Sequence, residues 1–145
     1  MNRSVALFYA LLLAIATHGQ EQKILTVTVN QKGIITLGRD IIKAGQLAQA
    51  LQERLFSSYK GTDRMHDRIV YIRYNNVADS IHTSVVQEIR SGQQRALNNY
   101  CIDRYRKRFD ELDEKRKQQV MDDLPVLFQT EYELPDDPAY TEPDR

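Results

Sequence analysis

The stretch from Ile24 to Leu37 reads I-L-T-V-T-V-N-Q-K-G-I-I-T-L, and it decides the fold. In its first part the apolar residues alternate with threonines, and this period of two predicts a half-buried β-strand. Asn30 to Gly33 supply turn residues, since glycine adopts a positive φ angle at no steric cost. Ile34 to Leu37 then form a second strand. We therefore predict a β-hairpin that ends at Gly38-Arg39-Asp40.

The next segments predict a helix and a central strand. Leu47, Leu51 and Leu55 recur every four residues, which indicates an amphipathic helix over about residues 44–59. Residues 68–74 (R-I-V-Y-I-R-Y) are β-branched, aromatic or basic, and this composition favours a strand.

Two further helices and a last strand are expected in the C-terminal half. Asp79 or Ser80 is expected to cap a long helix whose apolar residues step by three or four, and Asp113 is expected to cap another before Pro125 stops it. Residues 126–133 (V-L-F-Q-T-E-Y-E) are predicted as a strand. The apolar stripe of the long helix comprises Ile81, Val85, Ile89, Gly92, Ala96, Tyr100, Tyr105 and Phe109, and that of the shorter helix Val120, Met121 and Leu124.

The predicted order is therefore β-β-α-β-α-α-β. Strands interleaved with helices indicate an α+β domain, with a small sheet and helices packed on one face. This domain covers residues 20–134. Residues 135–145 contain three prolines and four acids in eleven residues, so we predict a disordered acidic tail.

The N-terminus has the layout of an export signal. Met1 to Arg3 make a short positive start, Val5 to Ala16 are apolar, and Thr17 to Gln20 are small or polar. The stretch from Ser4 to Gly19 is shorter than the roughly 20 apolar residues that span a bilayer, which favours a cleaved signal over a retained anchor. Both alternatives stay open for residues 1–19. Either one places the rest of the chain outside the cytoplasm.

Composition argues against a nucleic-acid-binding protein. The 145 residues include 20 basic and 20 acidic side chains, so no net field attracts a polyanion. The basic run Arg104–Arg108 is followed at once by acids at 110–114, as in a solvated face with local ion pairs. Tyr71 and Tyr74 lie on a predicted strand, but the aromatic-glycine signature of an RNA-binding sheet is missing.

The sequence holds no recognisable catalytic or metal-binding set. His18, His66 and His82 have no His or Cys at ligand spacing, and His66 reads as a loop residue. Ser80 and His82 stand two positions apart on a predicted helix, so their side chains should diverge. We expect no enzyme activity, cofactor or metal, and name no binding residue.

Cys101 is the one cysteine, so it cannot form an internal disulfide. Burial as a small apolar side chain is favoured for this residue. An intermolecular disulfide that links two chains is the alternative.

The hairpin and the central strand resemble the periplasmic domain of the ExbD/TolR family of biopolymer-transport proteins. The motif V-N-Q-K-G-I-I-T-L-G-R-D-I from Val29 to Ile41 is similar to the family's strand-turn-strand opening. The leucine helix follows, and Ile69 to Arg73 look like the family's V-x-I-R strand. The segment from Tyr105 to Glu114 is similar to the extended C-terminal form of Bacteroidetes members. In all, the likeness covers about residues 24–133.

The resemblance implies a periplasmic domain that forms a homodimer. It also implies a polytopic proton-channel partner of the ExbB/TolQ kind and an energy transducer of the TonB/TolA kind, with proton-motive force driving transport. The chain departs from the family in two respects: Val5 to Ala16 contain no acid that serves a proton path, and Ala78 to Ser80 lack the family's usual Pro-Tyr-Gly-like turn. The alternative is therefore a stand-alone periplasmic interaction module with no proton-coupling role.

Overall fold

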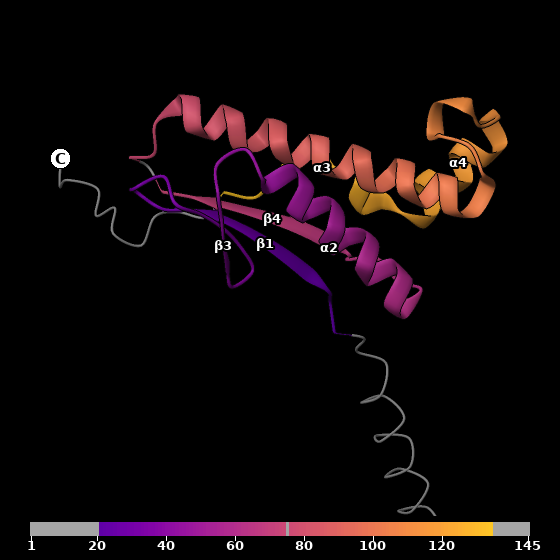
Figure 1. Ribbon diagram of the computed structural model, residues 1–145, viewed down its shortest axis with the longest axis horizontal. Coiled ribbons are helices and arrows are strands. Elements are labelled where there is room, and N and C mark those ends of the chain that lie inside the picture. Colours follow the sequence, from indigo (N-terminus) through magenta and orange to yellow (C-terminus); the bar gives the residue numbers. More distant parts are fainter. Residues whose placement is uncertain (1–20, 75, 135–145) are drawn as a thin grey trace, which may run out of the picture.

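The computed structural model describes residues 21–74 and 76–134 (Figure 1). The predicted signal or anchor at 1–19 and the predicted tail at 135–145 lie outside these residues. The fold is α+β, with a small mixed sheet and helices, as expected. In chain order the elements are β1 (Ile24–Val29), β2 (Ile35–Leu37), β3 (Asp40–Ile42), α2 (Leu47–Thr62), β4 (Arg68–Arg73), α3 (Asp79–Tyr105), the 3-10 turn η1 (Phe109–Glu111), α4 (Glu114–Asp123) and the 3-10 turn η2 (Pro125–Phe128).

The four strands lie in the order β3-β2-β1-β4, so the strand that was predicted to be central, β4, is instead an edge strand. β1 pairs antiparallel with β2 and parallel with β4, where Ile24 stands opposite Arg68 and Val29 opposite Arg73. α2 and α3 lie on the same side of this sheet (Figure 1). No helix among the described residues has both the length and the apolar character needed to cross a membrane.

The turn between β1 and β2 forms as its residue types predict. The side-chain oxygen of Asn30 accepts hydrogen bonds from the backbone N–H groups of Lys32 (2.9 Å) and Ile34 (3.0 Å). Gly33 has a φ angle of +74°, a conformation that side-chain-bearing residues rarely adopt. The predicted hairpin is confirmed, with its second strand beginning at Ile35.

The sequence prediction missed β3. The chain turns again at Gly38, whose φ angle is +63°, so that Asp40 pairs with Leu37 across a two-residue loop. The residues expected to end the hairpin therefore begin a third strand.

The predicted strand over residues 126–133 is wrong. Pro125 begins the 3-10 turn η2, and no strand is assigned to residues 129–134. The carbonyl of Val126 accepts a hydrogen bond (2.6 Å) from the side chain of Gln93, which is only 2 % exposed. This bond, together with the burial of Val126 and Leu127, holds the segment as a turn against the helices.

The helices were predicted with mixed success at their ends. α2 begins three residues later than expected, and Ala78, which makes no side-chain bond, is the N-cap of α3 in place of Asp79 or Ser80. Asp113 caps α4 as predicted, because its carboxylate accepts from the backbone N–H of Arg116 (2.9 Å). Met121, expected on the apolar face of α4, is 42 % exposed.

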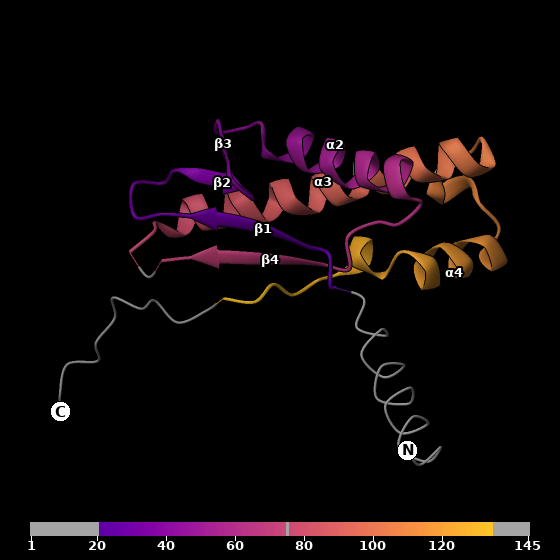
Figure 2. The ribbon, with the colours of Figure 1, turned by 90° about the horizontal axis from the view of Figure 1, so that it is seen from below.

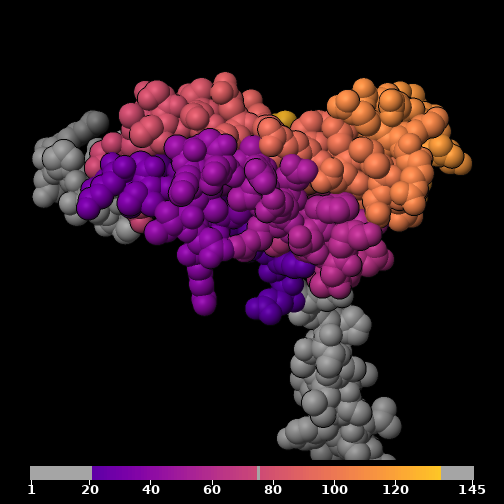
Figure 3. Space-filling view, in the orientation of Figure 1, coloured from indigo at the N-terminus to yellow at the C-terminus, as the bar shows by residue number. Residues whose placement is uncertain are grey.

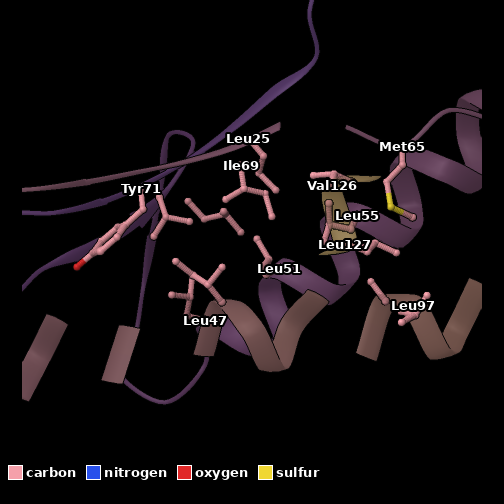
Figure 4. Packing of buried hydrophobic residues seen from close by; sticks show 14 of the residues in the cluster. Leu25, Leu47, Leu51, Leu55, Met65, Ile69, Tyr71, Leu97, Val126 and Leu127 are labelled. Carbon is pink, nitrogen blue, oxygen red and sulfur yellow. The ribbon is translucent and has the colours of Figure 1, made fainter. Parts of the chain in front are cut away.

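The core lies between the sheet and the two long helices (Figure 4). Leu47, Leu51 and Leu55 of α2 are fully buried in it, and each such leucine contributes about 1.5–3 kcal/mol by burial. Val126 and Leu127 of η2 are buried in this core near Leu55 (Figure 4). Cys101 is also fully buried, which confirms its expected place.

Candidate interaction surface

One face of the sheet is uncovered among the described residues. In β1, Leu25, Val27 and Val29 are buried against the helices, while Thr26 and Thr28 on the other face are partly exposed. Figure 2 looks onto this uncovered face, with α2 and α3 behind the strands. Because alternate residues of a strand point to opposite faces, the cross-strand neighbours Val70 and Ile72 share the face of the threonines.

Isoleucines extend the uncovered face to its edges. Ile24 is 46 % exposed, Ile34 40 % and Ile41 74 %. Ile41 pairs with Thr36 across β2 and β3, and both therefore point away from the helices. Together with the threonines, Val70 and Ile72, these residues make a surface without a charged centre, which we call the open face. Exposed apolar surface of this kind is typical of protein–protein contacts.

A second feature lies along the free side of β4. Residues 129–134, which we call the strap, run beside this strand (Figure 2). The Tyr132 hydroxyl donates to Gln93 Oε1 (2.8 Å), and the Tyr132 ring meets the Tyr71 ring edge-on at 6.5 Å. Glu133 forms an ion pair with Arg68. Side chains, rather than a backbone ladder, therefore hold the strap in place.

A hollow lies at the other end of the molecule. It measures about 660 Å³ and lies between the α2–β4 loop, the last turns of α3 and the end of α4. In Figure 3 the region of α4, in orange, lies at the end of the molecule away from the start of α3. The lining residues are Tyr59, Asp63, Arg64, Met65, His66, Asp67, Tyr100, Arg104, Asp122, Asp123, Leu124, Pro125 and Val126.

This hollow is lined mostly by polar and charged side chains. No serine, threonine or cysteine is among its lining residues, and burial raises the pKa of Tyr100 to about 12. His66 lies in the α2–β4 loop, as predicted. Burial lowers its pKa, and the nearby Lys23 lowers it further, so the imidazole is neutral at pH 7. The hollow therefore has polar walls that include four aspartates and a neutral histidine.

Ser80 and His82 point to different sides of α3, as their spacing predicts. His82 Nδ1 lies 3.1 Å from the Tyr71 hydroxyl, and the two rings stack at 5.5 Å. Ser80 is exposed and lines a separate hollow beside Gly33. Burial, aided by Arg73, lowers the pKa of His82. The contact of His82 with Tyr71 was missed, because nothing in the sequence places β4 beside the first turn of α3.

The remaining candidates are Cys101 and the basic run Arg104–Arg108, and both have neighbours that explain them without a catalytic role. Burial raises the pKa of Cys101 to about 11, so its thiol is protonated at neutral pH and has no access to another chain. In the basic run, Arg104 lies 5.9 Å from the centre of the Tyr105 ring, and Arg108 lies 3.8 Å from Asp110. Within residues 21–74 and 76–134, no group of three His, Cys, Asp or Glu side chains is placed to hold a metal ion.

Comparison of the sequence with protein-family models gives no match, and comparison with curated proteins gives none. The structural features described above therefore carry the functional argument.

Proposed function

We propose that the chain is a non-enzymatic accessory component of a proton-motive-force-driven transport complex, with an ExbD/TolR-like periplasmic domain. The observation that carries the proposal is the open face, an apolar and threonine-rich sheet surface that neither long helix covers. A sheet with both helices on one side leaves its other side available to another protein. The resemblance of Val29 to Ile41 to the family's opening motif suggests which kind of protein that is.

In this proposal the chain resides in the periplasm, soluble or anchored by its N-terminus, and forms a homodimer. Its partners are a polytopic proton channel of the ExbB/TolQ kind and a TonB/TolA-like transducer. The chain does no chemistry of its own in this proposal, and Ser80 and His82, the one pair considered as a nucleophile and base, lie on different sides of α3.

The test is site-specific crosslinking in the native host. A photo-crosslinking residue at Ile41, the most exposed isoleucine of the open face, should capture the channel or the transducer. The matched control is the same residue at Gln119, which is exposed on α4 and distant in the chain from the sheet. Equal capture from both positions, or purified channel complexes that never contain the chain, would contradict the proposal.

A stand-alone periplasmic interaction module is the second candidate. It is favoured by the lack of an acid between Val5 and Ala16, where a proton path would need one. Deletion of the gene separates the two functions. Loss of energy-dependent uptake at the outer membrane supports the transport role, whereas unchanged uptake supports the module.

A further inference from the structure

The strap occupies the free side of β4 without making a strand. None of the backbone–backbone hydrogen bonds outside regular elements in the described part of the chain involves residues 129–134. The one bond to the β4 backbone runs from the Ile69 N–H to the side chain of Gln129, at 3.4 Å. An edge strand that lacks a backbone partner is a template for pairing with another chain. The strap therefore covers the edge of β4 but forms no backbone–backbone hydrogen bonds with it.

Tyr132 and Glu133 make the side-chain contacts that hold the strap at this edge. The Tyr132 ring reaches the core beside Tyr71, and its hydroxyl bonds to the buried side chain of Gln93. Glu133 pairs with Arg68 at the start of β4. An aromatic residue next to an acid is therefore the recognised pattern.

Further guanidinium groups lie near the same edge. Arg73 at the end of β4 has an Nη1 atom that is buried without a hydrogen-bond partner among the described residues, although an Asp79 oxygen lies 3.6 Å away. Arg90 of α3 is exposed and close enough to Tyr132 to influence it: burial raises the pKa of Tyr132, and the charge of Arg90 opposes that rise. Arg68, Arg73 and Arg90 therefore give this edge three guanidinium groups, which complement an acidic segment.

We propose that the free edge of β4 is a docking site for an acidic, extended segment of a partner protein that carries an aromatic residue, and that the strap occupies this site in cis. The partner segment adds to the sheet as a strand, gains the backbone hydrogen bonds that the strap does not make, and places its aromatic residue beside Tyr71. The strap competes with it at the high effective concentration of a tethered segment. This inference does not depend on the transport role, since it concerns only the chain and the chemistry of the segment that binds it.

The experiment measures binding of a labelled peptide with the sequence of residues 129–134 (Q-T-E-Y-E-L) to the full chain by fluorescence anisotropy. In the wild-type chain the strap blocks the edge. The Tyr132→Ala variant loses the anchor of the strap, so the peptide should bind at least fivefold more tightly. Glu133→Ala, which removes an exposed partner of Arg68 and leaves the core untouched, should shift affinity in the same direction by a smaller factor.

The matched control is Glu131→Ala, because Glu131 is an exposed strap residue that makes no ion pair among the described residues. It should bind the peptide as the wild type does. Backbone amide shifts on binding should fall on residues 68–73. The proposal is overturned if neither Tyr132→Ala nor Glu133→Ala binds more tightly than the wild type, if a peptide with lysines in place of its glutamates binds equally well, or if the shifts lie outside β4.

Discussion

Replacement of Gly92 by alanine should destabilise the domain, although the same change usually stabilises a helix. A Cβ atom at Gly92 would lie 2.8 Å from the carbonyl oxygen of Ala48 and 2.9 Å from two side-chain atoms of Leu51. Real Cβ atoms do not approach so closely, and the carbonyl belongs to the backbone of α2, so the helix itself has to move. Such overpacking costs about 1–3 kcal/mol. We therefore expect Gly92→Ala to lower the free energy of unfolding by about that amount.

Gly61 provides the matched control for this prediction. It lies near the end of α2, and a Cβ there would meet no atom within 4 Å. Gly61→Ala should raise the free energy of unfolding by about 0.4–1 kcal/mol, because alanine has fewer conformations to lose on folding. Urea unfolding followed by circular dichroism measures both variants. The prediction fails if the two substitutions change the free energy of unfolding in the same direction. In that case, the close packing of α2 against α3 does not explain the glycine at position 92.

Three further predictions concern single side chains. Gln93→Leu should cost about 1–3 kcal/mol in the same urea assay, because the buried Val126 carbonyl loses its donor; no loss would mean that the bond is dispensable. Asp113→Ala should lower the melting temperature at pH 7. The bond from the Arg116 N–H holds the pKa of Asp113 below its ordinary value, so the stabilisation is full above about pH 4 and is lost as the pH falls through the lowered pKa. A difference from wild type that does not shrink as the pH falls below about 4 would contradict this. Cys101 should react with a thiol reagent at pH 8 only after unfolding, and rapid reaction of the folded chain would refute its burial.

The elements that the sequence predicts well are those with a local cause. The threonine alternation before Asn30 and the turn at Gly33 fix the first hairpin, since a period of two and a positive φ angle act within a few residues. Asp113 caps α4 for the same reason, because its carboxylate reaches an N–H only three residues away. Such features do not depend on the rest of the fold.

The features that the sequence does not predict depend on distant partners. Residues 126–128 look like a strand by composition, but Gln93, more than thirty positions earlier, captures the Val126 carbonyl and favours a 3-10 turn. β3 is three residues long, too short for a periodic pattern to show. The open face was not predicted as a site, although helices on one face of the sheet were expected. The sequence does not show the strand order that brings the partly exposed Thr26 and Thr28 beside Val70 and Ile72.

The parallel pairing of β1 with β4 has a consequence for the order of folding. The hairpins β1–β2 and β2–β3 close over a few residues, whereas Ile24 meets Arg68 only after the whole of α2 has intervened. Closing that longer loop costs chain entropy before any contact compensates for it, so this step should limit the folding rate. In stopped-flow experiments we therefore expect Ile69→Val in β4 to slow folding and Val126→Ala in η2 chiefly to speed unfolding. The edge strand β4 would then join β1 before the C-terminal turn η2 packs against the helices.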